Sequence, residues 1–341
     1  MKFTFALLAG AVATAAASLT SIPDEIMDDS DFPTFMQFIQ DHSKNYVNQA
    51  EFLGRFMIFK NNLRLAAERN QKGTEKHGVT KFMDMHPDEF TAKMKGHKAR
   101  SIATDAPAKD FNATEIESAK LQSIDWVAKG ATTPVKNQGQ CGSCWAFSAT
   151  EQIESDIFLS TGKLHVLAPQ QIVSCDTVDL GCNGGNTDTA YEYVMQAGGI
   201  EPESDYPYTS GTTETNGVCK FNKADVATDI TGYKYVSQSA SQERQMYTQL
   251  QQSPISICVD ATIWQTYQSG IITTSSDCGT QLDHCVQLVG ATSASDSSTG
   301  KAYYKIRNSW ATDWGEQGYI YVEAGHNVCG LALEATVVSP N

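Results

Sequence analysis

Cys144 stands where a helix is expected to begin. Apolar side chains recur at helical spacing over residues 145–159, and Gly142-Ser143 is typical of the turn before a helix. In the first helical turn the dipole favours a thiolate, and beside a protonated histidine the pKa of a thiol can fall to roughly 3.5 to 7.5. The position therefore suits a nucleophile. Cys141 and Cys144 also form a C-x-x-C pair, which leaves a thiol-disulfide oxidoreductase as an alternative.

A cysteine nucleophile needs a general base, and three histidines follow residue 119. His165 and His326 lie in contexts typical of surface or packing residues. His284 instead begins a short apolar run, residues 285–290, that suits a buried strand. We therefore expect His284 to be the base.

A second strand pattern, residues 302–310, follows a polar loop. In an antiparallel hairpin with its loop centred on Asp296, residue 284 faces residue 308 in the simplest register, unless a bulge shifts the pairing by one residue. The amide of Asn308 can accept a hydrogen bond from the imidazole of His284 and fix its tautomer. The spacing thus predicts a Cys-His-Asn triad.

Charge and cysteine content divide the chain into two parts. The 341 residues carry 39 acidic and 25 basic side chains, and a net charge of -14 argues against nucleic acid as a partner. Residues 1–119 have a net charge of -2, whereas residues 120–341 have a net charge of -12 and contain all nine cysteines. A cysteine-free segment before a cysteine-rich one predicts a separable first module.

The first residues have the features of a secretory signal peptide. Lys2 precedes an apolar stretch, residues 3–17, which ends in three alanines and is too short to span a bilayer. We expect residues 1–17 to be removed, no membrane association, and a location in a lysosome or vacuole or outside the cell. This route permits disulfides, and it makes Asn112, in the sequon Asn112-Ala-Thr114, a candidate glycosylation site.

The segment Gln138-Gly-Gln-Cys141-Gly-Ser-Cys144-Trp145 resembles the active-site signature of the papain family of cysteine proteases. The resemblance implies an α+β fold of two domains with the cleft between them. A helical left domain would carry Cys144, and a β-barrel-like right domain would carry His284 and Asn308. It also implies that the side chain of Gln138 joins the backbone N–H of the nucleophile in an oxyanion hole.

The first module resembles the inhibitory propeptide of cathepsin L-like proteases. Two motifs carry this resemblance, namely Glu51-x3-Arg55-x3-Phe59-x2-Asn62-x3-Ala66-x3-Asn70 and Gly78-x-Thr80-x-Phe82-x-Asp84, in which Ala66 and Thr80 depart from the usual residues. On a helix Glu51 and Arg55 would form an ion pair beside an apolar stripe. The implied organisation is a signal peptide at 1–17, a helical inhibitory propeptide at 18–119 and a peptidase domain at 120–341.

The same resemblance assigns the substrate cleft. The segment Gly181-Cys182-Asn183-Gly184-Gly185 matches the one whose last glycine pairs by its backbone with the substrate residue two positions before the scissile bond. The pocket for the side chain of that residue would be lined by Thr187, Cys258, Asp283, Cys285 and Glu334. Trp310 and Trp314 resemble the aromatic wall that shields the triad asparagine. An acid at position 334 predicts a pocket that accepts Arg as well as Phe or Leu.

The resemblance also implies three disulfides, Cys141 with Cys182, Cys175 with Cys219, and Cys278 with Cys329. Cys144 must stay free to act as the nucleophile. Cys258 and Cys285 have no partners by the family pattern, so they either form a fourth bridge or remain two thiols in the pocket.

These observations predict a cysteine endopeptidase that hydrolyses peptide bonds through a thioester acyl-enzyme and is made as an autoinhibited zymogen. Its partners would be protein and peptide substrates and its own propeptide, which acts as an intramolecular inhibitor. No metal or cofactor is required, and we expect a monomer. The alternative from another class is a catalytically inactive binding protein on the same scaffold.

Overall fold

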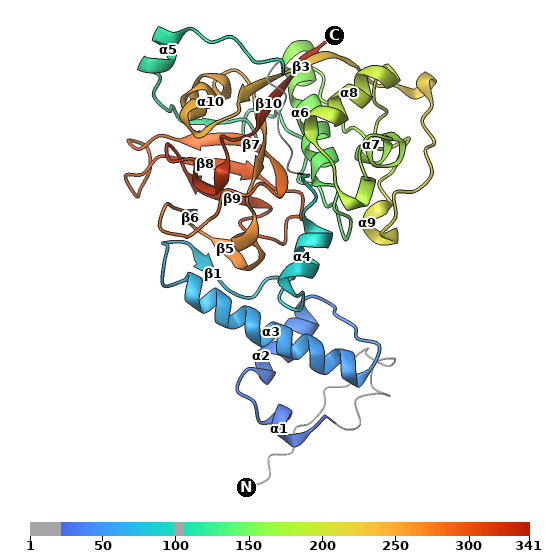
Figure 1. The fold of residues 1–341 in the computed structure, drawn as a ribbon, viewed down its shortest axis with the longest axis vertical. Helices are drawn as coiled ribbons and strands as arrows, with labels where there is room; N and C mark the ends of the chain where they lie inside the picture. Colours follow the sequence, from blue (N-terminus) through green and yellow to red (C-terminus); the bar gives the residue numbers. More distant parts are fainter. Residues whose placement is uncertain (1–21, 99–105) are drawn as a thin grey trace.

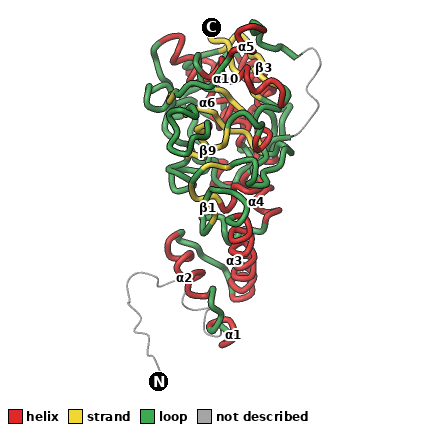
Figure 2. Tube along the Cα trace, turned by 90° about the vertical axis from the view of Figure 1, so that its left-hand side faces the viewer, coloured by secondary structure: helices red, strands yellow, loops and turns green. Residues whose placement is uncertain are grey.

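The computed structural model describes residues 22–98 and 106–341, and the predicted signal peptide lies outside them. The fold is α+β. A helical part formed by the first described residues extends from one end of the molecule, and a larger body of helices and sheet forms the rest (Figures 1 and 2). Within the described residues, no helix has the length and apolar character needed to cross a membrane.

The extended part, which we call the helical unit, consists of α1 (Asp24–Met27), α2 (Phe32–Asp41) and α3 (Gln49–Arg69). The side chain of Asn48 caps α3 by accepting the N–H of Glu51. Apolar residues of α2 and α3 meet in a separate core, whose fully buried members are Phe35, Phe38, Phe52, Phe56, Phe59 and Met83. The helical unit therefore has a core of its own.

The chain then crosses to the larger body. β1 (Lys76–His77) pairs with β5 (Tyr267–Ser269). The last residue of α4 (Pro87–Met94) and the four residues that follow it, 94–98, form what we call the cleft segment, and its backbone is extended from Lys95. Four apolar side chains of this region belong to the core of the larger body, namely Phe82, Met85, Phe90 and Met94. After the undescribed gap, α5 (Ala113–Ser118) packs near α10 (Glu243–Leu250) (Figure 1).

The helical lobe of the larger body contains α6 (Cys144–Thr161), α7 (Pro169–Cys175), α8 (Thr187–Ala197) and α9 (Ser210–Thr213). α6 is the central helix and is buried over almost its whole length, because it lies between the other helices and the sheet. Gly162 ends it in the left-handed conformation, φ 73°, that suits glycine at a helix terminus. The site at the start of α6 thus rests on a rigid element.

The sheet lobe is built on one mixed sheet with the strand order β3-β10-β4-β7-β8-β9-β6, and β2 pairs with the end of β7. Its strands are β2 (Ile124–Asp125), β3 (Ile230–Ser237), β4 (Ile255–Val259), β6 (Ile271–Ile272), β7 (His284–Thr292), β8 (Tyr303–Arg307), β9 (Tyr319–Glu323) and β10 (Ala335–Pro340). Across the described residues this path is open, with β3 at one end and β6 at the other, so the barrel-like domain that we expected is an open sheet.

All nine cysteines lie in described residues, and four disulfides join eight of them. Three of these are the pairs that the resemblance implied: Cys141–Cys182, Cys175–Cys219 and Cys278–Cys329. The fourth joins Cys258 of β4 to Cys285 of β7, two residues that face each other in the sheet. Of the two alternatives left open by the sequence, Cys258 and Cys285 therefore form a fourth bridge rather than two free thiols.

Candidate active site

Cys144 is the first residue of α6 and carries the unpaired thiol. Its Sγ accepts the backbone N–H of Cys285 at 3.5 Å, so the start of α6 directly meets the start of β7. Cys141, the other half of the C-x-x-C pair, is bonded to Cys182. This pairing contradicts the thiol-disulfide oxidoreductase, which requires Cys141 and Cys144 to be joined to each other.

The side chains of His284 and Asn308 meet as predicted, although the predicted register of the hairpin was wrong. Gln287 pairs with Arg307, a register that places residue 284 opposite residue 310 rather than 308. The error of two residues leaves the same side chains on the same face, because the period of a strand is two. His284 Nε2 lies 2.8 Å from Asn308 Oδ1, and Trp310 stacks on the imidazole with ring centroids 4.7 Å apart.

The other two candidate histidines, His165 and His326, are more exposed to solvent than His284. His326 is exposed and His165 is half-buried, whereas His284 and Asn308 are fully buried. Trp264 meets the imidazole of His284 edge-on and completes, with Trp310 and Trp314, an aromatic cluster around it. We had not identified Trp264 from the sequence, and nothing in its local pattern distinguishes it from a core residue.

Cys144 and His284 are both held in their neutral forms. Burial raises the pKa of the Cys144 thiol to about 12, and burial lowers the pKa of the His284 imidazole to about 3. Our expectation of a lowered thiol pKa is therefore wrong for this state of the protein. The physical reason is desolvation, which penalises each charged form more than the helix dipole and neighbouring hydrogen bonds favour it.

Gln138 lies fully buried beside the nucleophile and donates both hydrogens of its amide. Nε2 donates to the carbonyl oxygens of Cys141 at 3.0 Å and Met94 at 3.1 Å. Trp310 Nε1 donates to the same Met94 oxygen at 3.0 Å. The carbonyl oxygen of Met94, at the start of the cleft segment, thus accepts hydrogen bonds from two buried side chains.

The cleft segment passes between Gly185 and Asp283 as an added strand. Gly185 N–H donates to Gly96 O at 2.8 Å, and Lys98 N–H donates to Gly185 O at 3.1 Å. From the other side the backbone N–H groups of Gly96 and His97 donate to Asp283 O at 3.0 and 3.1 Å. The predicted substrate-binding glycine therefore pairs with the backbone of the chain's own first module.

Gly96 fits this path because it has no side chain. A Cβ at this position would lie 1.9 Å from the carbonyl oxygen of Gly142, just before the nucleophile. Gly184, with φ 107°, approaches Gly96 O in the same way. Backbone packs on backbone here, which only glycine permits.

The predicted pocket is occupied by the side chain of His97. Its Nε2 lies 3.4 Å from Glu334 Oε2, and Glu334 Oε1 lies 3.7 Å from Cys258 Sγ. The sulfurs of Cys258 and Cys285 and a ring nitrogen of His97 all lie within 4.8 Å of one another. Thr187 is buried at the start of α8. The structure thus brings Cys258, Cys285 and Glu334 together as predicted neighbours.

Ion pairs join lysines of the first module to aspartates of the acidic body. Lys95 Nζ lies 2.6 Å from Asp283 Oδ2, and Lys81 Nζ lies 2.5 Å from Asp313 Oδ1. We had not singled out Lys95 or His97 from the sequence. The available signal was the charge contrast between the two parts of the chain, which predicts basic side chains wherever they touch.

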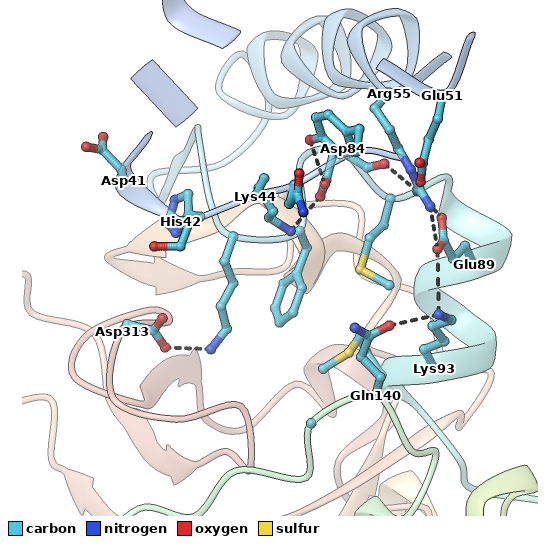
Figure 3. A pocket seen from close by; sticks show the side chains of 18 of the residues that line it. Asp41, His42, Lys44, Glu51, Arg55, Asp84, Glu89, Lys93, Gln140 and Asp313 are labelled. Carbon is cyan, nitrogen blue, oxygen red and sulfur yellow. Dashed lines mark hydrogen bonds and ion pairs between the residues drawn. The ribbon is translucent and has the colours of Figure 1, made fainter. Parts of the chain in front are cut away.

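A polar groove between the helical unit and the body contains a second group of contacts (Figure 3). Arg55 pairs with Glu89 of α4, and Lys93 donates to Gln140 at 2.8 Å. The predicted helical pair of Glu51 with Arg55 is therefore wrong, since Glu51 instead accepts the N–H of Val47 at 2.7 Å. The guanidinium of Arg55 thus pairs with the carboxylate of Glu89, which is distant in the sequence, rather than with that of Glu51 on the same helix.

Two family models match the chain. Residues 121–339 match the papain family cysteine protease model, and residues 35–90 match the cathepsin propeptide inhibitor domain (I29). Cysteine proteinase 1 of Dictyostelium discoideum is 38% identical over 315 residues, covering 87% of this chain and 90% of that protein. Cysteine proteinase 15A of Pisum sativum is 37% identical over 363 residues, covering 99% of this chain and 98% of that protein.

Solved structures of precursors are similar over nearly the whole chain. A recombinant stem bromelain precursor has a TM-score of 0.79 at 32% identity, covering 92% of this chain and 100% of that one. Digestive procathepsin L 3 from the larval midgut of Tenebrio molitor has a TM-score of 0.73 at 30% identity, covering 91% of this chain and 99% of that one. The similarity thus includes the first module as well as the body.

Proposed function

The chain belongs to the papain family of cysteine proteases and carries a cathepsin-type propeptide, and on this premise we propose that Cys144, His284 and Asn308 form the triad of an endopeptidase. The contact between His284 Nε2 and Asn308 Oδ1, 2.8 Å long, carries the proposal. It commits Nε2 to the asparagine, so that Nδ1 is the ring nitrogen left for proton transfer. Within the described residues, His284 Nδ1 has no hydrogen-bond partner.

The proposed reaction proceeds in two halves. His284 takes the proton of the Cys144 thiol, and the sulfur attacks the substrate carbonyl to form a tetrahedral intermediate. The imidazolium then protonates the leaving amine, which leaves a thioester on Cys144. In the second half His284 removes a proton from water, which hydrolyses the thioester and restores the thiol. Asn308 holds the imidazole in the required orientation throughout.

Gln138 would stabilise the oxyanion once the first module has left. Its Nε2 now donates to Met94 O at 3.1 Å, so removal of Met94 frees one N–H of this amide. A donor aimed at the developing charge commonly contributes roughly 2.7 to 4 kcal/mol. In the covered state the enzyme therefore has its oxyanion donor occupied as well as its nucleophile buried.

We propose that the pocket at Glu334 receives the side chain two positions before the scissile bond, together with Gly184 and Gly185 for its backbone. Glu334 is 5% exposed and already pairs with an imidazole, that of His97. A buried carboxylate needs a cationic or hydrogen-bonding partner, so the pocket should accept Arg as well as Phe or Leu. The matched test compares Arg-Arg and Phe-Arg reporter peptides in wild type and Glu334→Gln.

The proposed nucleophile is tested with a thiol-directed epoxide on the matured protein. We expect one adduct, on Cys144, and complete loss of peptidase activity, with neither adduct nor activity in Cys144→Ala. Absence of an adduct in a correctly folded, matured protein would support the catalytically inactive binding protein instead. Mapping the adduct by peptide mass distinguishes Cys144 from any reduced disulfide cysteine.

The remaining expectations concern processing and location. We propose removal of residues 1–17 in the secretory pathway, a mature N-terminus near residues 119–123, and an acidic vacuole, a lysosome or the extracellular space as the destination. Asn112 is exposed, which supports glycosylation of the precursor at this residue, although its Oδ1 also caps α5. N-terminal sequencing of active protein tests the boundary.

A further inference from the structure

The Cys258–Cys285 disulfide has an unusual place for a structural bridge. It joins directly paired residues of two neighbouring strands, β4 and β7, with Cα atoms 4.0 Å apart, so it closes a link that the sheet hydrogen bonds already make. The residues on both sides of the pair, 257 with 286 and 259 with 284, are held in the same ladder. The bridge therefore contributes little to strand pairing that the sheet does not already provide.

The disulfide forms a wall of the proposed side-chain pocket. Glu334 Oε1 lies 3.7 Å from Cys258 Sγ, and a ring nitrogen of His97 lies within 4.8 Å of both sulfurs. Cys285 also donates its backbone N–H to Cys144 Sγ at 3.5 Å. The disulfide thus lies beside the residue proposed to select the substrate, and one of its two residues contacts Cys144 through the backbone.

The cover of this disulfide is temporary. Cys258 and Cys285 are each 1% exposed, and a ring nitrogen of His97 in the cleft segment lies within 4.8 Å of both sulfurs. When the first module is removed, His97 leaves with it and no longer covers the sulfurs. Exposed disulfides are more readily attacked by thiols than buried ones, so the bridge becomes reducible only in the mature enzyme.

We propose that the Cys258–Cys285 disulfide determines the specificity of the mature enzyme, so that the closed bridge favours Arg in the pocket and its reduction shifts preference toward Phe. This inference rests on the proposed function of the pocket at Glu334.

The chemical step is a thiol-disulfide exchange with a small dithiol. One thiolate of the dithiol attacks Sγ of Cys258 or Cys285, the other cysteine leaves as a thiolate and takes up a proton, and the second dithiol sulfur resolves the mixed disulfide. Two electrons and two protons move from the dithiol to the protein, which gains two thiols. The dithiol becomes a cyclic disulfide.

Reduction changes the pocket in two ways. Two unbonded sulfurs must separate to van der Waals contact, which moves at least one of them relative to the pocket. In addition, the Cys258 thiol gains an S–H that can donate to Glu334 Oε1, with which its sulfur is already in contact. An incoming guanidinium must then compete with this donor for the carboxylate, whereas a phenyl ring does not.

The experiment uses the mature enzyme in buffers with graded ratios of reduced to oxidised dithiol. The readout is the ratio of kcat/KM for Arg-Arg and Phe-Arg reporters, which cancels any change in the fraction of active Cys144. Mass spectrometry after alkylation reports the state of Cys258 and Cys285. We expect the Arg-to-Phe ratio to fall roughly three- to tenfold as this pair is reduced, and to recover on reoxidation.

Variants give independent arms of the test. Cys258→Ser with Cys285→Ser keeps a donor beside Glu334 and should show the low ratio at every dithiol ratio. Cys175→Ser with Cys219→Ser removes a disulfide of the helical lobe and should retain the full redox response. The wild-type titration needs no variant to fold.

Two results would overturn the inference: a constant ratio while the pair is shown to be reduced, or a pair that stays oxidised at dithiol ratios that fully activate Cys144. Failure of the pocket assignment looks different. In that case Glu334→Gln leaves the Arg-to-Phe ratio unchanged in both redox states. Failure of the proposed enzyme activity gives no cleavage of either reporter.

Discussion

The helical unit and the cleft segment both lie in the first module but are stabilised differently. The helical unit packs around its own phenylalanine core, whereas four side chains between that unit and the cleft segment pack into the core of the peptidase, namely Phe82, Met85, Phe90 and Met94. Beyond Met94 the cleft segment is held mainly by backbone hydrogen bonds and the Lys95–Asp283 pair. The difference indicates that the residues that stabilise the helical unit are not the residues that cover the cleft.

The largest expected effect on the cover of the cleft comes from Gly96→Val. A Cβ at this position meets Gly142 O at 1.9 Å, and both partners are backbone that cannot rotate away. Overpacking of this kind should raise the rate at which the epoxide labels Cys144 in the intact zymogen by roughly 10- to 100-fold. Gly54→Ala is the matched control, since nothing lies within 4 Å of that Cβ, and it should leave labelling unchanged. Equal labelling of both variants would contradict the assigned role of Gly96.

Acid should act on the cleft segment through His284. The pKa of this imidazole is lowered to about 3 under cover, mainly by burial, whereas a solvated histidine titrates near 6.5. The covered state therefore binds fewer protons, and its stability falls as the pH drops below 6.5 toward the covered pKa, by at most roughly tenfold in the closing equilibrium per pH unit. The population of the open state therefore rises over the same pH range.

This pH dependence is measured as amide exchange of residues 94–98 in a Cys144→Ser zymogen, corrected for the intrinsic rates. Protection should decline between pH 6.5 and pH 4, and Cys144→Ser with His284→Gln should lose most of that decline. The same decline in both proteins would show that other groups drive the opening. Exchange in α3 serves as the internal reference for the helical unit.

Phe59→Ala should have the smallest effect on the cleft and a large one on the helical unit. Phe59 is fully buried in the helical-unit core, and its truncation should cost about 3 to 5 kcal/mol of local stability, seen as faster amide exchange in α2 and α3. Labelling of Cys144 should rise by no more than about threefold, because residues 82–94 keep their own contacts with the peptidase. A rise as large as that of Gly96→Val would mean that the two regions are one cooperative unit.

The sequence was informative where local pattern and chemistry agree. The start of α6 at Cys144 follows from helix signals, and the meeting of His284 with Asn308 survived a wrong register because strand periodicity preserves the face. The Glu51–Arg55 pair failed because the sequence does not show which distant carboxylate, here Glu89, will approach. The pKa of Cys144 failed because burial by a remote segment outweighs the local helix dipole.

The occupant of the pocket was also beyond prediction. The sequence places His97 thirteen residues after a recognised motif, but only the path of the chain brings it to Glu334, 237 positions later. The bridge between Cys258 and Cys285 depended on the pairing of β4 with β7, which no local signal specifies. Hydrophobic periodicity reports local structure, so it does not reveal contacts between residues that are far apart in the sequence.

Phe82, Met85, Phe90 and Met94 are members of the peptidase core that the proposed maturation would remove. The mature enzyme is then a molecule that has lost part of the interior around which it folded. Its folded form need not be the state of lowest free energy at all, and its working life would be set by how slowly it unfolds. The operational stability of such a protease is then a half-life, which begins when the precursor is cut.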